Sequence, residues 1–457
     1  MKTTRLLTTL VLLAAASAAA AQSAWVLTTD YSTFGRLRGF APDAPWSVSA
    51  DLATVPGDAV ARHHDGRLYV VGRAGANVLQ VYGESGTLER EFSLGAGRNP
   101  QDIAFDTAGD AYVSCYDTAE LLKVDVAAEA VTAVYPTAPW ADADGLPETA
   151  WMTAVGDMLY IAAQKLDRDN WYAPTGPGLL LVFDMATDTF AAPITLTGSD
   201  PYTRIEQVTT AGGGLLLRVG CAGWFGVADA GIESVDPQTG LSLGYDLTEA
   251  QLGGDVTAFV TTAPGVIHAV VSDASFRTHL VRGDTGGAPT TTLASATGYH
   301  FADVAWDGDA QLYLADRNPS APGLRVFDAV SGAELTGGAL GTGLPPFQIV
   351  LPSDDVSAAP LPALAGSLSL GAPFPNPCNP RAEVVLSGRP GDAVRVSVCD
   401  LRGRRLHAET VRLDAAGTRT WVFAGTDRSG RALPAGVYRL VAQGDDGFAV
   451  RSVTLVK

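Results

Sequence analysis

The chain has 457 residues, with 50 glycines and 27 prolines, and a formal net charge of −18. The charge is uneven: residues 369–457 hold 13 Lys and Arg against 8 Asp and Glu, a net of +5, which leaves 18 against 41, a net of −23, on residues 1–368. A strongly acidic body repels nucleic-acid phosphates, so this class of partner is excluded. The length suggests two domains, or one repeat array and a smaller module.

The N-terminal residues have the pattern of a cleaved secretory signal peptide. A positively charged start is followed by an apolar run over residues 6–16 and by small residues up to Ala21. A membrane anchor needs about 20 apolar residues, and this run is shorter. We therefore expect a signal peptide over residues 1–21, a mature chain with no transmembrane segment, and a secreted protein or one on the outer cell surface.

A unit of about 40 residues recurs after the signal. Each unit holds four short runs rich in Val, Leu and Tyr, separated by Gly, Asp or Asn turns. Four antiparallel strands per repeat form one blade of a β-propeller. Six complete units begin near Asp58, Asp102, Ala150, Ile205, Asp255 and Asp303.

The two ends of the repeat region predict one more blade. Residues 25–29 (Trp-Val-Leu-Thr-Thr) read as a second strand without an inner strand, and residues 347–351 (Phe-Gln-Ile-Val-Leu) read as an inner strand with nothing after it. Pairing them closes the ring and removes two exposed sheet edges. We expect an all-β chain with a seven-bladed propeller over residues 22–352, six or eight blades being the alternatives. A solenoid would need capping units at its ends instead.

The repeat pattern resembles the NHL and YVTN-type propellers. Their Pro-x-x-(Ile/Val)-Ala inner strand has a counterpart in residues 99–104 (Asn-Pro-Gln-Asp-Ile-Ala), and their second strand in residues 68–71 (Leu-Tyr-Val-Val). The resemblance implies the propeller fold rather than an activity.

Residues 353–368 are rich in Ala, Pro, Ser and Asp and read as a linker. In the module over residues 369–457, Val394, Val396 and Val398 alternate with polar neighbours, as a strand with one buried face requires. Further motifs are Pro-Asn-Pro-Cys-Asn-Pro (375–380), Val-Cys-Asp-Leu-Arg-Gly-Arg (398–404) and Pro-Ala-Gly-Val-Tyr (434–438).

These motifs resemble the Ig-like C-terminal sorting domain of type IX-secreted proteins, which is similar to the Ig-like domain of flagellar hook-capping proteins. The resemblance implies an Ig-like β-sandwich that secretion or sorting machinery reads as an address. Cys378 and Cys399 stand where that family usually has aromatic residues. They are either two buried thiols or a disulfide, which an oxidising compartment would permit. Cys115 and Cys221 are expected to be buried apolar residues.

The chain contains none of the familiar hydrolase, metalloprotease or phosphate-loop motifs. One of two long insertions follows a second strand, and the other links two units. In a propeller, the loops after the second strands and the links between blades lie on the same face. Exposed aromatic residues beside carboxylates are typical of ligand sites, although the same Trp residues could instead cover the blades as packing. The candidate ligand-binding residues are Trp140, Asp142, Asp144, Asp167, Asp169, Trp171, Tyr172, Trp224 and Asp316.

Carboxylates also recur near the starts of the inner strands, at Asp58, Asp102, Asp255 and Asp303. A ring of them could hold a hard cation such as calcium. The alternative, which we favour, is that each Asp accepts backbone N–H groups at its turn.

These observations favour a binding protein that recognises an extracellular ligand or partner through one loop-rich face. The alternative is a cation-dependent propeller hydrolase or lactonase, in which a channel cation activates water. A third hypothesis is an envelope protein with no small ligand.

Overall fold

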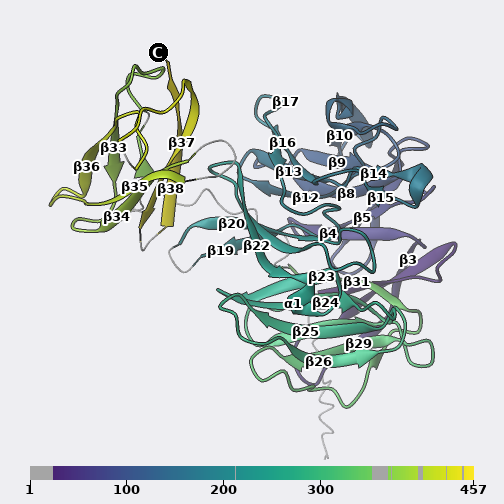
Figure 1. Cartoon of the computed structure of the whole chain (residues 1–457). Helices are drawn as coiled ribbons and strands as arrows, with labels where there is room; N and C mark the ends of the chain where they lie inside the picture. The colour runs from purple at the N-terminus through teal and green to yellow at the C-terminus, as the bar shows by residue number, and fades with distance from the viewer. Residues whose placement is uncertain are drawn as a thin grey trace, which may run out of the picture.

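The computed structural model describes residues 24–210, 213–352, 369–371, 373–399, 405–428, 430–444 and 447–456. The predicted signal peptide and the predicted linker lie outside these residues. Nearly all regular structure within them is β-strand (Figure 1). The helical elements described are the 3₁₀ turns η1 (Ala138–Trp140) and η2 (Arg168–Asn170) and the helix α1 (Glu249–Leu252). None of these described helices has the length and apolarity to cross a membrane.

Seven antiparallel sheets form the propeller, and we number these blades in chain order. Blade 1 contains β4 (Ala59–His64), β5 (Arg67–Gly72), β6 (Val78–Gly83) and β7 (Leu88–Ser93). Blade 2 contains β8 (Pro100–Phe105), β9 (Ala111–Cys115), β10 (Glu120–Asp125) and β11 (Ala130–Pro136). Blade 3 contains β12 (Thr149–Val155), β13 (Met158–Ala163), β16 (Leu179–Asp184), β17 (Thr189–Phe190) and β18 (Ile194–Thr195).

Blades 4 to 6 repeat the arrangement. Blade 4 contains β19 (Glu206–Thr209), β20 (Leu215–Cys221), β21 (Gly231–Asp236) and β22 (Leu241–Thr248). Blade 5 contains β23 (Asp255–Ala263), β24 (Val266–Ser272), β25 (Thr278–Asp284) and β26 (Thr291–Ala296). Blade 6 contains β27 (Phe301–Trp306), β28 (Gln311–Asp316), β29 (Gly323–Asp328) and β30 (Leu340–Gly341). The short hairpin β14 (Leu166–Asp167) and β15 (Ala173–Pro174) is inserted in blade 3.

Blade 7 joins the two ends of the repeat region, as the sequence predicts. It contains β31 (Pro346–Val350), β1 (Ala24–Thr28), β2 (Phe34–Phe40) and β3 (Val48–Pro56). The inner strand β31 pairs antiparallel with β1, with Trp25 opposite Val350 and Val26 opposite Ile349. The prediction of seven blades closed by these two segments is therefore confirmed.

The core of the propeller lies between the blades rather than within them. Seven apolar clusters each join two neighbouring blades, and the last of them packs Trp25 and Val350 of blade 7 against Ala61 and Leu68 of blade 1. Second strands such as β5 are buried on both faces, which explains their unbroken apolar runs, whereas outer strands such as β11 alternate in exposure. The ring of interfaces places all seven inner strands around one axis.

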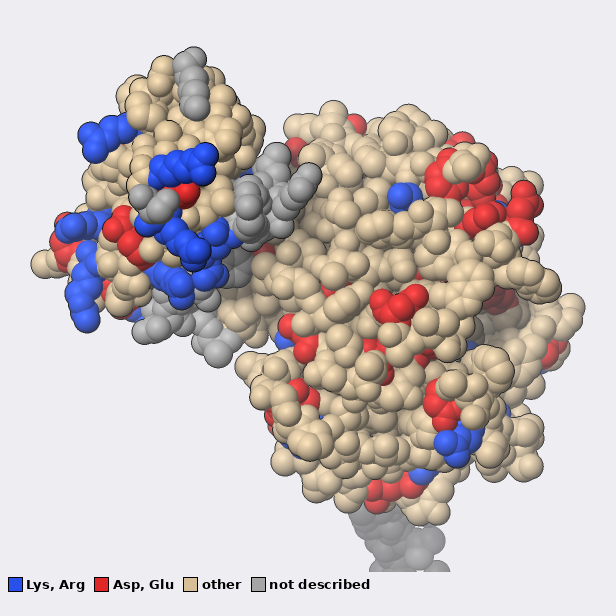
Figure 2. Space-filling view, in the orientation of Figure 1, with Lys and Arg blue, Asp and Glu red and all other residues tan. Residues whose placement is uncertain are grey.

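The C-terminal residues form a two-sheet sandwich. One sheet has the order β32 (Ser369–Leu370), β33 (Ala382–Ser387), β36 (Thr418–Phe423), and the other β35 (Arg405–Arg412), β34 (Ala393–Cys399), β37 (Gly436–Gly444), β38 (Gly447–Leu455). Both sheets contribute to one core, and Val394, Val396 and Val398 are all buried in it, as predicted. Their neighbour Arg395 is exposed, whereas Ser397 is also buried. Lys and Arg gather on this sandwich, while Asp and Glu prevail on the visible face of the propeller (Figure 2).

The cysteines are free thiols where the structure describes their side chains. The disulfide considered between Cys378 and Cys399 is not formed, because Cys378 lies beside β38, while Cys399 is in β34 on the far side of β37. Three strand spacings of about 4.8 Å far exceed the reach of a disulfide. Cys115 and Cys221 are buried in apolar clusters, as expected, and burial raises the pKa of Cys115 to about 12.

Candidate ligand-binding site at the mouth of the central channel

A central cavity of about 370 Å³ opens where the inner strands begin, and we call it the mouth cavity. Antiparallel pairing brings the start of each inner strand beside the end of its second strand, as Ala59 opposite Gly72 and Phe301 opposite Asp316 illustrate. Residues just outside these positions therefore meet around the axis. Every blade contributes, in blade order through Arg73, Tyr116, Gln164, Tyr202, Phe259, Arg317 and Phe347.

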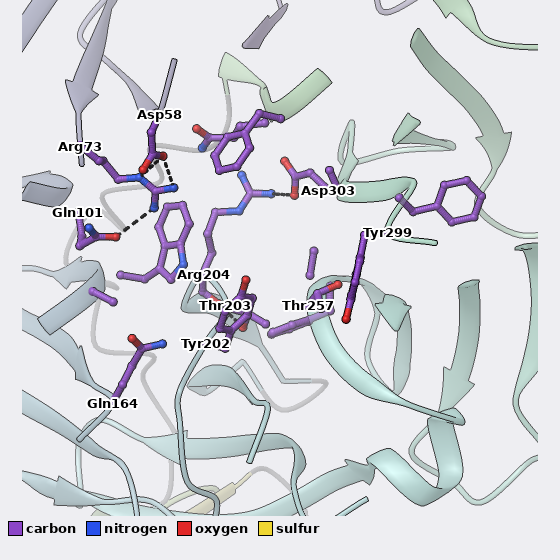
Figure 3. Close-up of a pocket in the computed structure, with 18 of the residues that line it drawn as sticks. Asp58, Arg73, Gln101, Gln164, Tyr202, Thr203, Arg204, Thr257, Tyr299 and Asp303 are labelled. Atoms are coloured by element: carbon purple, nitrogen blue, oxygen red, sulfur yellow. Dashed lines mark hydrogen bonds and ion pairs between the residues drawn. The ribbon is translucent and has the colours of Figure 1, made fainter. Parts of the chain in front are cut away.

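Two of the three arginines at the mouth cavity are paired with carboxylates (Figure 3). The guanidinium of Arg73 donates to Asp58 Oδ1 over 2.6 and 2.8 Å and to Gln101 Oε1 over 3.0 Å. Arg204 donates to Asp303 Oδ1 over 2.8 Å. These pairs fix both side chains while leaving little uncompensated charge.

The third arginine, Arg317, has a different environment. Its Nε donates to the carbonyl oxygen of Pro346 over 3.2 Å, and its guanidinium lies 5.2 Å from the ring centre of Phe347 and 5.9 Å from that of Tyr31. Within the described part of the chain no carboxylate forms an ion pair with it. Burial lowers the pKa of the Arg317 guanidinium from its usual value.

Deeper in the channel, charged groups are fully engaged, and we call this level the waist. Asp102 accepts hydrogen bonds from Arg62 over 2.7 and 2.9 Å, from its neighbour Ile103 N, and from Met152 N of blade 3 over 2.8 Å. Asp303, which also lines the mouth cavity, accepts in the same way from Arg204 and from Ile349 N of blade 7. These carboxylates connect adjacent inner strands.

Between other pairs of adjacent inner strands, glutamine and glutamate side chains form the hydrogen bonds that aspartate forms here. Gln348 of blade 7 exchanges two hydrogen bonds with the backbone of Ala61 in blade 1. Glu206 of blade 4 accepts from Thr261 N of blade 5 over 3.0 Å. Below the waist a second cavity of about 310 Å³ opens, and Arg204 and Phe259 line both cavities.

The four carboxylates considered as cation ligands do not converge. Asp58 is paired with Arg73, and Asp255 accepts from Gly226 N over 2.7 Å. Asp102 and Asp303 serve the inter-blade bonds just described. Among the described residues no three His, Cys, Asp or Glu side chains are placed to hold one ion. Asp102, Asp255 and Asp303 accept backbone N–H groups, whereas the described bonds of the Asp58 carboxylate come from the guanidinium of Arg73.

Beside the mouth cavity lies an aromatic groove of about 370 Å³, lined by Trp171, Tyr172, Trp224 and Phe225. The side chain of Trp171 is 90% exposed and that of Trp224 is 40% exposed. The hairpin β14–β15 and the turn η2 present Trp171 and Tyr172, both with positive φ angles of 57° and 59°. Two consecutive non-glycine residues in this region carry backbone strain, which is concentrated at functional sites.

The groove and the mouth cavity are adjacent, because Tyr116, Gln164, Tyr202 and Phe225 line both. Tyr202 and Phe225 meet edge to face with ring centres 5.4 Å apart. Asp200 also lines the groove, where it accepts from Gln164 Nε2 over 2.7 Å, and burial raises its pKa to about 7.

The structure brings together only part of the predicted ligand site. Trp171, Tyr172 and Trp224 share the groove, but Trp140 is half-buried and packs on Phe190 with ring centres 4.6 Å apart. The predicted carboxylates Asp142, Asp144, Asp167, Asp169 and Asp316 lie outside the groove lining. All of them except Asp169 accept a local backbone N–H group, and Asp142 also accepts from Thr175, while Asp144 and Asp316 also pair with arginine. Asp169 contributes its own backbone N–H to Asp167.

Of the residues predicted from the sequence, Asp58 and Asp303 line the mouth cavity, but sequence reasoning missed Arg73, Arg204 and Phe347 as site residues. A signal was present, because Arg73, Tyr116, Gln164 and Arg317 each directly follow the second strand of a unit. Aligning the units on that strand would have placed them around one axis.

No family model and no curated protein matches the sequence. Solved structures that resemble it include PorZ, described as an essential bacterial surface component of the type-IX secretion system of Porphyromonas gingivalis, at 12% identity and a TM-score of 0.39 over 93% of this chain and 56% of PorZ. This chain thus spans little more than half of PorZ.

Two further structures are similar. One is dihydro-heme d1 dehydrogenase NirN in complex with DHE, at 16% identity and a TM-score of 0.46 over 73% of this chain and 76% of NirN. The other is apo AztD from Citrobacter koseri, at 13% identity and 0.42 over 72% of this chain and 97% of AztD. At these identities the likeness concerns the arrangement of strands only.

Proposed function

We propose that the chain is an exported propeller that binds a small ligand in the mouth cavity and aromatic groove. The observation that carries this proposal is the pair of exposed indoles, Trp171 and Trp224, beside a cavity to which all seven blades contribute. Aromatic side chains bury large areas at small entropic cost, so soluble proteins rarely expose two of them in one groove without a partner.

The same geometry favours binding over the hydrolase or lactonase alternative. That mechanism requires several channel carboxylates free to hold a cation that activates water. Asp102 and Asp303 are occupied by arginine and by backbone N–H groups of the next blade. The carboxylate oxygens of both residues therefore hold adjacent blades together instead of coordinating a cation.

The binding proposal is tested by saturation-transfer NMR with a panel of sugars, amino acids and aromatic acids. We expect signals from bound compounds that are lost in Trp224→Ala and in Trp171→Ala. Trp306→Ala is the matched control, because Trp306 lies at the other end of β27, where it lines the second cavity. Binding that survives both groove variants would contradict the proposal.

We also propose that residues 1–21 are a signal peptide, that residues 353–368 are a linker and that residues 369–457 are an Ig-like sorting domain. The support is the motif resemblance, the two-sheet fold and the separate, basic character of this module. Deletion from Ser369 onward should leave a folded propeller in the periplasm or released unattached. Surface display equal to that of the full chain, measured by protease accessibility on intact cells, would contradict the sorting role.

A further inference from the structure

We infer that the mouth cavity receives the anionic group of an organic ligand, a carboxylate or a phosphate, and that Arg317 is the residue that binds it. This inference rests on the proposed binding function and adds the chemical class of the ligand. It starts from the difference between Arg317 and the two other arginines of the cavity.

Arg317 is positioned but not neutralised. Its Nε is held by the carbonyl oxygen of Pro346, and the plane of the guanidinium packs over Phe347 and Tyr31. In the part of the chain that the structure describes, no protein acceptor is bonded to its two Nη atoms. A planar fork held in this way matches the two oxygens of a carboxylate or phosphate, and charge-assisted bonds of this kind are strong.

The local charge supports an anion despite the acidic protein. The lining holds Arg73, Arg204 and Arg317 against Asp58 and Asp303, a net charge of +1 where the chain as a whole carries −18. The two acids are already engaged by the two other arginines. A bound anion would therefore meet a cation that has no carboxylate partner among the described residues, while both acids are engaged by other arginines.

The shape of the site indicates the rest of the ligand. Two adjacent spaces of about 370 Å³ each, which share four lining residues, are within the range of small-molecule sites. From the mouth cavity the lining passes through Tyr202 and Phe225 to Trp171 and Trp224. We therefore assign the ligand an anionic head at Arg317 and a planar or apolar body along these rings.

The experiment uses the full chain and four naphthalene probes in isothermal titration. The anions 2-naphthoate and 2-naphthyl phosphate are compared with neutral 2-naphthamide and with the cation 2-naphthylmethylammonium, in a phosphate-free buffer of low ionic strength. We expect the anions to bind at least about tenfold more tightly than the amide, since one charge-assisted bond is worth that factor. The order of the two anions tells carboxylate from phosphate.

Arg317→Gln should abolish the advantage of the anions and leave the affinity for the amide unchanged. Arg90→Gln is the control, because Arg90 pairs with Glu129 on the propeller surface. In the unmodified chain, the advantage should also shrink as salt is added, a readout that needs no variant.

The possible failures are distinguishable. Equal affinity for anions and amide in the unmodified chain, or an unchanged advantage in a folded Arg317→Gln protein, would overturn the anion inference and leave the groove intact. Failure of every probe to bind would overturn the proposed binding function itself. Trp224→Ala should weaken all naphthalene probes alike, because it removes the surface that contacts their common body.

Discussion

The mouth and the waist of the channel use the same residue types with opposite outcomes. At the waist, Asp102 accepts four hydrogen bonds and Arg62 is fixed by it, so both charges serve the joints between blades 1, 2 and 3. At the mouth, Arg317 has one backbone acceptor and faces the cavity. The number of satisfied bonds, rather than the residue type, separates a structural charge from one available to a ligand.

The groove and the waist differ in the same way for buried carboxylates. Asp102 has an arginine partner, whereas Asp200 beside the groove has the amide of Gln164. A buried charge without a cationic partner is costly, so the pKa of Asp200 rises. We therefore distinguish a structural level, the waist, where charged groups are paired, from a ligand level, the mouth cavity and groove. At the ligand level, Arg317 and Asp200 have no ion-pair partner among the described residues.

The largest effect should come from breaking the ring itself. Deleting residues 346–352 removes β31, its ladder with β1 and the contacts of Ile349 and Val350 with both neighbouring blades. We expect a loss beyond the range of about 0.5–3 kcal/mol typical of point variants. Urea unfolding monitored by circular dichroism measures it, and a truncated chain that unfolds at the same urea concentration as the full chain would refute closure by this strand.

A smaller but still large effect is expected at the waist. Asp102→Ala leaves the Arg62 charge without its partner and removes the acceptor of Met152 N, so we expect a loss of about 3–5 kcal/mol in the free energy of unfolding. Asp58→Ala is the control, because its side chain is 41% exposed and its pair with Arg73 should contribute less than about 1 kcal/mol. Equal losses would remove the distinction between waist and mouth.

Much of the fold followed from sequence, because strand runs, turn residues and the two complementary half-units are local patterns. The seventh blade could be predicted since Trp25 and Phe347 begin segments that each lack one partner. The site was only partly predictable. Carboxylates at equivalent positions suggested a cation ring, but Arg62 and Arg204, which neutralise two of them, come from other blades and no periodicity connects them.

The role of the aromatic residues was equally beyond local patterns. Trp140 and Trp171 are both in long insertions, and only the fold shows that one packs on Phe190 while the other faces solvent. Arg317 could have been suggested by its place after a second strand. Its lack of a carboxylate partner among the described residues depends on the side chains that the six other blades place around it, so it could not be predicted from the sequence.

The pH dependence of the free energy of unfolding should distinguish Asp200 beside the groove from Asp102 at the waist. Burial raises the pKa of Asp200 from 3.8 to about 7, so in the folded chain this group keeps a proton that the unfolded chain has lost. Its contribution therefore favours folding below about pH 4 and is lost as pH rises to about 7, by up to about 1.4 kcal/mol per pH unit.

Asp200→Asn should remove this dependence. The gain in stability of the variant over the parent should grow between about pH 4 and 7 and stay constant above, as measured by urea unfolding at several pH values. Asn can still accept the hydrogen bond from Gln164, so the change tests the charge alone. A gain that does not vary with pH would show that Asp200 is ionised throughout and would place it with the paired groups of the structural level.

The smallest effect should be at Trp171, and it is the most informative for the ligand level. The indole is 90% exposed and presented by a strained turn, so Trp171→Ala should change the free energy of unfolding by no more than about 0.5 kcal/mol. Trp140→Ala removes a half-buried ring packed on Phe190 and should cost about 2–3 kcal/mol, because the apolar contacts of that ring are lost. Thermal unfolding of the two variants in parallel compares one Trp from each of the two insertions. A large loss in Trp171→Ala would mean that this ring packs against the protein in solution, and it would then belong to the structural level together with Trp140. A small loss, combined with the disappearance of naphthamide binding in the same protein, would assign the exposed ring to ligand recognition, because a side chain that contributes little to folding would then contribute to affinity.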